Sequence, residues 1–167
     1  MATNNFSTPK EKFSKPYAAA VVSLTVILPA MSAFAESVMR GERFASAGVL
    51  GKWFIFWAVG VRLFSAGIRQ VVDPAFTARD IFHIENSASH AIVRELGFAN
   101  ICFGVIGIIS LFLPQWRIVS AFGSGLFYGI AGFNHLIKKP ASPNETIALV
   151  SDIFIFLALL AYVARAF

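Results

Sequence analysis

Residues 147–164 read IALVSDIFIFLALLAYVA, a continuous apolar run in which Asp152 is the only charged residue. A helix of roughly 20 mostly apolar residues can cross the hydrocarbon core of a membrane. Polar and apolar residues do not alternate here, so the run predicts a helix and not a barrel strand. The run follows Ser142-Pro143-Asn144-Glu145, which combines an N-cap serine, a proline at the first helical position and a glutamate three residues after the cap. The sequence therefore predicts a transmembrane helix that starts directly after Ser142.

Four earlier stretches have the same character. They are Tyr17–Val38, Val49–Val72, Leu96–Leu113 and Ile118–Ile137. The whole chain is 57% hydrophobic and 14% charged, whereas about a quarter of the residues in a soluble domain are charged. We therefore predict an all-α, multi-pass transmembrane helix bundle. Four core helices form a membrane domain over residues 49–166, an N-terminal helix precedes it, and the lipid bilayer is the expected partner.

The N-terminal region supports two interpretations. Residues 1–16 are polar and predict a flexible tail. In residues 17–38, lysines precede an apolar core that is followed by Pro29 and the small-residue pattern Ala33-Phe34-Ala35. This pattern is typical of a cleavable signal peptide, but the stretch is also long enough to be an ordinary first transmembrane helix. Both interpretations are kept.

An amphipathic helix is predicted at about residues 77–94. Thr77-Ala78-Arg79-Asp80 resembles a capping box with Asp in place of Glu. Apolar residues then recur at helical spacing, and His83, Ser87, His90 and Arg94 form a polar stripe beside them. Such a segment is expected to lie at the membrane surface.

Lys and Arg in the connections predict the orientation, because these residues are enriched on the cytoplasmic side of a membrane. With the N-terminus inside, eight basic residues lie in inner segments and five in outer segments, so we expect the N-terminus inside and the C-terminus outside. The net charge of +5 comes from these scattered flanking residues. No compact basic stripe with interleaved aromatic residues is present, so nucleic acid is not an expected partner.

Several polar residues lie within the apolar stretches, where a charged side chain costs roughly 2.5–3.5 kcal/mol. We predict that they form a pocket for a small molecule or ion at the inner end of the bundle. The candidate ligand-binding residues are Arg62, Arg69, Glu95, Asn100, Tyr128, His135 and Asp152. The alternative is a set of structural salt bridges, for example Arg62 with Asp152 and Arg69 with Glu95.

Other features leave further functions open. Glycine ridges at Gly97–Gly107 and Ala121–Gly129 predict close helix packing, either within the chain or in a homo-oligomer. Small size without a catalytic motif also fits an accessory or structural subunit of a larger membrane complex, and no enzyme activity is expected.

His90 and His135 would be needed for a haem- or quinone-linked redox protein. A lone cysteine, Cys102, excludes an internal disulfide or thiolate cluster. The sequence identifies neither a metal site nor a cofactor.

The segment Glu95-Leu96-Gly97-Phe98-Ala99-Asn100, the run from Tyr128-Gly129 to His135, and Ser151-Asp152-Ile153 resemble an uncharacterised bacterial family of small four-helix membrane proteins. The likeness covers about residues 50–165, omits the first apolar stretch and extends loosely to DoxX-like proteins. It implies a place in the bacterial inner membrane and points to Glu95, Asn100, His135 and Asp152. Arg62 and Arg69 depart from the family pattern, in which a histidine is expected on that helix. The resemblance implies no activity.

Overall fold

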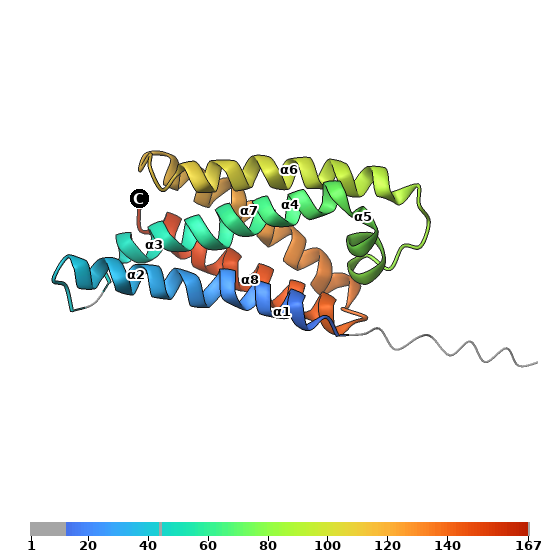
Figure 1. Cartoon of the computed structure of the whole chain (residues 1–167), viewed down its shortest axis with the longest axis horizontal. Coiled ribbons are helices and arrows are strands. Elements are labelled where there is room, and N and C mark those ends of the chain that lie inside the picture. The colour runs from blue at the N-terminus through green and yellow to red at the C-terminus, as the bar shows by residue number, and fades with distance from the viewer. Residues whose placement is uncertain (1–12, 44, 167) are drawn as a thin grey trace, which may run out of the picture.

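The computed structural model of the chain describes residues 13–43 and 45–166, in which every regular element is helical. Two long helices each contain a π-helical insertion and are labelled in three parts. The first comprises α1 (Lys15–Val22), η1 (Ser23–Ile27) and α2 (Leu28–Met39), and the second comprises α3 (Ala47–Phe54), η2 (Ile55–Val61) and α4 (Arg62–Val72). The other elements are α5 (Pro74–Phe76), η3 (Thr77–Ile81), α6 (Ser89–Ile109), α7 (Trp116–Lys138) and α8 (Pro143–Ala164). The long helices lie side by side as a bundle, and the described chain begins and finishes at opposite ends of it (Figure 1).

Serine caps fix the starts of three described helices, namely α1 at Ser14, α3 at Ser46 and α8 at Ser142. Ser142 Oγ accepts a hydrogen bond from the Glu145 N–H at 3.1 Å, so the predicted start of α8 is confirmed. Ser46 caps α3 in the same way and accepts from the Val49 N–H at 3.3 Å. A cap of this kind is worth about 1 kcal/mol. The caps of α3 and α8 lie at opposite ends of the bundle, because α3 starts where α8 finishes (Figure 1).

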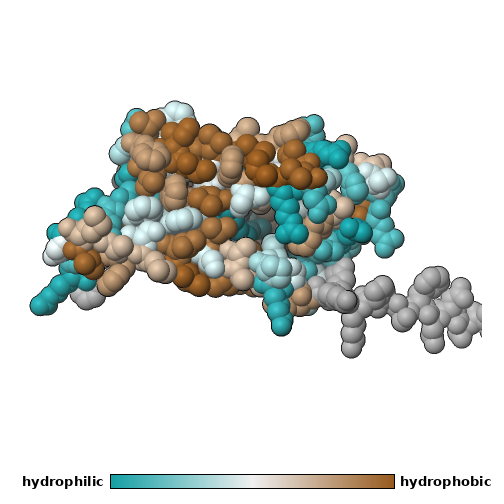
Figure 2. Space-filling view, viewed as in Figure 1, coloured by the Kyte–Doolittle hydropathy of each residue, from teal (hydrophilic) through white to brown (hydrophobic). Residues whose placement is uncertain are grey.

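Four of the helices in the described part of the chain are long and apolar enough to cross a membrane. They are Lys15–Met39, Ala47–Val72, Ser89–Ile109 and Pro143–Ala164. The predicted span at 118–137 forms α7, which is long but is not among them, and which is rich in glycine and serine. Polar residues gather at the two ends of the molecule, and apolar residues lie between them (Figure 2). Large apolar side chains are exposed along this middle region, for example Phe34 and Ile130, as expected of a surface that faces lipid.

Glycines allow the helices to approach closely. A Cβ built on Gly104 would lie 2.4 Å from the Phe64 backbone nitrogen, and one on Gly107 would lie 2.6 Å from that of Gly60. The ridge on α6 therefore packs against η2 and α4. On α7, a Cβ on Gly129 would lie 2.8 Å from the Phe156 ring of α8. Both predicted ridges are used for packing within the chain, around a core that includes Ile55, Val59, Tyr128, Ile155 and Leu159.

The predicted amphipathic helix at 77–94 is wrong as a continuous element. Residues 77–81 are helical, 83–86 are not, and 89–94 form the first turns of α6. His83 has a φ of 57°, a left-handed conformation that is rare for residues other than glycine. A right-handed helix cannot continue through such a residue, so the helix ends before it. Of the predicted flexible tail, residues 1–12 lie outside the described part, and Lys15 and Pro16 already belong to α1.

Candidate ligand-binding site

An ion pair between Arg62 of α4 and Asp152 of α8 lies at the centre of the site. The Arg62 Nη2 is 3.1 Å from the Asp152 Oδ1 and donates to the Ser151 Oγ at 2.8 Å. The guanidinium also lies over the Tyr128 ring, 5.1 Å from its centroid. Each side chain of the pair is only 12% exposed. The predicted pairing of Arg62 with Asp152 is confirmed.

Tyr128 is held by a backbone contact across the bundle. Its hydroxyl donates to the Ala58 carbonyl oxygen of η2 at 2.9 Å. In a regular α-helix this carbonyl would accept from the Arg62 N–H four residues later. At the end of the π-helical turn that N–H donates instead to the Trp57 and Val59 oxygens, which leaves the Ala58 oxygen available to α7. Tyr128 is almost fully buried and belongs to the apolar core. The tyrosine ring thus forms a fixed wall beside the Arg62 guanidinium.

These residues line a cavity of about 690 Å³ between α1, α4, η3, α6, α7 and α8. Six of the seven predicted site residues line it, namely Arg62, Arg69, Asn100, Tyr128, His135 and Asp152. Glu95 does not and is exposed on α6. Between α1 and α4, where the cavity lies, the molecular surface is hollowed (Figure 2). Apolar side chains such as Leu24, Leu63 and Phe127 provide much of the remaining wall.

Two buried polar atoms on the cavity wall have no hydrogen-bond partner among the described residues. One is the Arg62 Nη1, a donor, and the other is the Asn100 Oδ1, an acceptor. Asn100 is 4% exposed, and its Nδ2 donates to the Gln70 Oε1 at 2.7 Å, so the amide is fixed with one end engaged. Leaving a buried polar group unpaired costs roughly 1–3 kcal/mol, and more for a charged group.

Aromatic residues and Arg69 form the rim of the cavity. The Arg69 guanidinium carbon lies 3.7 Å from the centroid of the Phe76 ring in α5, and Phe76 packs against Tyr17 of α1 with ring centroids 6.0 Å apart. The predicted pairing of Arg69 with Glu95 is wrong, because no ion pair joins them among the described residues. The turn at Asp73-Pro74 brings Phe76 back beside Arg69, and the cation lies over the ring.

Glu145 connects two histidines next to the cavity. Its Oε1 is 3.2 Å from the His135 Nδ1, and its Oε2 is 3.1 Å from the His83 Nε2. The Ala141 N–H also donates to the Glu145 Oε2 at 2.8 Å. Glu145 is 5% exposed. This carboxylate therefore fastens the loop at 82–88 to the α7–α8 connection.

The sequence missed three residues of this region. The sequence pattern predicts Glu145 as a capping residue and His83 on a surface stripe, and it predicts no role for Gln70. Their partners are distant in the chain, so no local spacing marks them. The available signal is at Gln70, a polar residue directly after Arg69 in a stretch that is mostly apolar.

The described histidine, cysteine and carboxylate side chains do not come together as a metal site. Among residues 13–43 and 45–166, no group of three or more His, Cys, Asp and Glu side chains is placed to hold a metal ion. His90 lies in the first turn of α6 and does not line the cavity, whereas His135 does. The haem or quinone hypothesis stays a prediction.

Comparison with known proteins identifies the family of the chain. Residues 18–166 match a family of unknown function, DUF6790, and the chain belongs to this family. The match includes the first apolar stretch, which the resemblance based on the sequence motifs had omitted. No curated protein and no solved structure matches the chain.

Proposed function

We propose that this member of the DUF6790 family is a multi-pass membrane protein that binds a small polar molecule in the cavity around Arg62 and Asn100. One observation carries the proposal: a buried donor, the Arg62 Nη1, and a buried acceptor, the Asn100 Oδ1, line the same cavity without partners in residues 13–43 and 45–166. Buried polar groups in proteins are nearly always hydrogen-bonded. A bound molecule that pairs with both atoms would remove their desolvation cost.

The wall defines the chemistry of this ligand. It needs a hydrogen-bond acceptor for Arg62, a donor for Asn100 and an apolar remainder to contact Leu24, Leu63 and Phe127. Asp152 already balances the Arg62 charge, so a neutral ligand such as an amide, a hydroxy ketone or a protonated acid fits better than a free ion. A volume of about 690 Å³ lies within the roughly 300–1,000 Å³ typical of small-molecule sites.

We further propose that the cavity opens toward the inner side of the membrane. Among the described residues, the basic residues toward the cavity end slightly outnumber those toward the other end. The first group comprises Lys15, Arg69, Arg79, Arg94, Lys138 and Lys139, and the second comprises Arg40, Arg43, Lys52, Arg117 and Arg165. An excess of basic residues favours the cytoplasmic side. No reaction is proposed, because no described residue that lines the cavity forms a nucleophile with an adjacent base. The accessory-subunit hypothesis stays a prediction, and the glycine ridges that motivated it pack within the chain.

Ligand-dependent thermal stability of the purified chain tests the proposal. A panel of amides, hydroxy ketones, short acids and quinones is added at about 100 times an assumed dissociation constant, where binding stabilises the folded state by roughly 2.7 kcal/mol. We expect one class to raise the melting temperature of the wild-type protein. Ala131 lines the cavity, so Ala131→Phe should fill it and abolish that shift. Ala158→Phe, on α8 away from this cavity, is the matched control and should keep the shift. The proposal fails if no compound stabilises the wild type, or if Ala131→Phe responds as the wild type does.

A further inference from the structure

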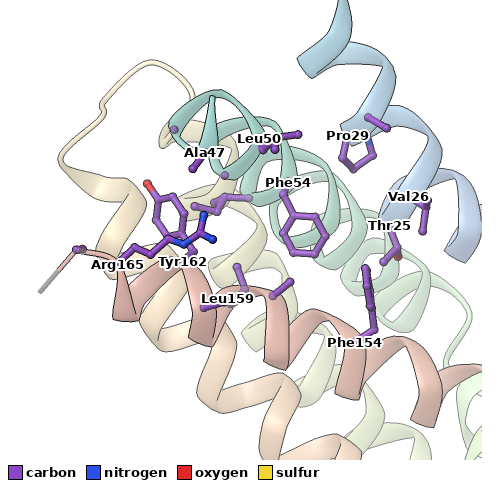
Figure 3. A pocket seen from close by; sticks show the side chains of 17 residues that line it. Thr25, Val26, Pro29, Ala47, Leu50, Phe54, Phe154, Leu159, Tyr162 and Arg165 are labelled. Atoms are coloured by element: carbon purple, nitrogen blue, oxygen red, sulfur yellow. The ribbon is translucent and has the colours of Figure 1, made fainter. Parts of the chain in front are cut away.

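A second cavity of about 600 Å³ lies between α2, α3 and α8. It is separate from the proposed ligand site and is lined mainly by apolar and small side chains, including Pro29, Leu50, Phe54, Phe154 and Leu159 (Figure 3). Leu50 and Phe154 are also exposed, so the cavity is a groove that continues the apolar surface of the bundle. An occupant of this groove would enter from the lipid phase.

The length of the groove matches one leaflet of a bilayer. Phe154 lies at one end of the lining and Arg165 at the other (Figure 3). Along α8 these residues are about 16 Å apart, at about 1.5 Å per residue. Half of the hydrocarbon core is about 15 Å thick. The groove therefore runs from the end of a membrane-crossing helix to about the middle of the membrane, as a single acyl chain does.

The charged residue in the groove lining, Arg165, lies at the end of the groove farthest from Phe154. The Arg165 side chain has no ion pair or hydrogen bond with another described residue, and its guanidinium lies beside the Tyr162 side chain (Figure 3). Ala47 and Gly48, the first residues of α3, line the same end. The first amides of a helix carry partial positive charge and favour a bound anion. A cation and a helix N-terminus thus meet where an apolar groove reaches the membrane interface.

We propose that this groove binds one anionic glycerophospholipid. An acyl chain lies along α8 between α2 and α3, and the headgroup phosphate lies beside Arg165 and the start of α3. Charge complementarity distinguishes this occupant from a zwitterionic lipid or a non-ionic detergent, because neither supplies the net negative charge that Arg165 would balance. The small residue Ala158 leaves space that the chain fills, whereas the absence of a side chain at Gly51 makes room for the Tyr162 ring.

Native mass spectrometry of the purified full-length chain tests this proposal. The protein is released from detergent after addition of equal amounts of phosphatidylglycerol and phosphatidylcholine. We expect one phosphatidylglycerol to be retained about fivefold more than phosphatidylcholine, which corresponds to about 1 kcal/mol for one basic residue near an anionic group. Arg165→Gln should bring the ratio close to one, and Ala158→Phe should remove the retained lipid of both kinds.

Matched controls separate this site from the proposed ligand cavity. Arg94→Gln removes an equal charge from an exposed position on α6, and Ala131→Phe fills the other cavity; both should retain phosphatidylglycerol as the wild type does. Equal retention of the two lipids by the wild-type protein overturns the proposal. It is also overturned if Arg165→Gln keeps the preference, and because Arg165 is exposed, this variant tests the idea even if Ala158→Phe does not fold.

Discussion

Arg62 is a charge that the bundle accommodates with one carboxylate, one hydroxyl and one aromatic face. Asp152→Asn would leave the guanidinium buried without a counter-charge. Breaking a buried pair from one side typically costs about 3–5 kcal/mol, so we expect a loss of this order in unfolding titrations in detergent. The double variant Arg62→Gln/Asp152→Asn should lose less than Asp152→Asn alone. Asp73→Asn, at an exposed position, is the control and should be nearly neutral. A double variant that is less stable than the single one would contradict this account.

Glu145 is a second single residue on which local structure depends, because it holds a loop in place. Glu145→Ala removes the contacts to His83, His135 and the Ala141 N–H. Two backbone hydrogen bonds hold the segment around His83. They run from the Phe82 N–H to the Thr77 oxygen and from the Ile84 N–H to the Ala78 oxygen. We expect faster amide hydrogen exchange over 77–84 in this variant, by a factor of about ten for a loss of about 1.4 kcal/mol. Glu85→Ala, in the same loop but exposed, should leave exchange unchanged, and equal exchange in both variants would show that Glu145 does not fasten the loop.

At the scale of the elements, the contact between α4, η2 and α6 depends on the absence of side chains. Gly104→Ala would place a methyl group 2.4 Å from the Phe64 backbone nitrogen, and backbone cannot move aside as a flexible side chain can. Overpacking typically costs about 1–3 kcal/mol, so thermal stability should fall. Gly48→Ala, where the nearest atom would be 3.9 Å away, should be neutral or slightly stabilising because alanine favours the helix more than glycine does. If both variants melt alike, close backbone packing at Gly104 is not important.

Element boundaries show how far local sequence signals reach. The Ser142-Pro143 start of α8 was predictable because capping is a local interaction. The surface helix at 77–94 was not, because the left-handed backbone of His83 accompanies a contact to Glu145, 62 positions later. Arg62 and Asp152 could be paired from the desolvation cost of two charges in apolar helices. Arg69 was predicted to pair with Glu95 for the same reason, but Arg69 lies near a helix end where a ring from α5 was available.

At the scale of the whole molecule, the first long helix, formed by α1, η1 and α2, contributes to the walls of both cavities. Tyr17 and Leu24 line the cavity around Arg62, and Val26 and Pro29 line the groove beside α8. Its far end is tied to α3, since Glu36 accepts from the Trp53 Nε1 at 2.6 Å and also pairs with Lys52. The Trp57 Nε1 donates to the Ser32 Oγ at 2.9 Å. If residues up to Ala35 were cleaved as a signal peptide, both cavities would lose a wall, so we expect intact-mass measurement of the membrane-extracted protein to find this helix retained. A mass that begins after Ala35 would remove the basis of both proposed sites.

Orientation decides which side of the membrane each cavity serves. The five helices of the bundle place the loop at 83–86 and the turn at 114–115 at opposite ends of the molecule (Figure 1). Glu85→Cys and Gln115→Cys, each in a Cys102→Ala background, put one thiol at each exposed end, and replacing Cys102 removes the exposed native thiol. Because the basic residues favour the cavity end inside, a membrane-impermeant maleimide should label Gln115→Cys in intact cells and Glu85→Cys only after the membrane is opened. The reverse pattern would place the cavity around Arg62 on the outer side. It would also move the groove that ends at Arg165 into the inner leaflet, where an anionic lipid would have to come from the cytoplasmic face.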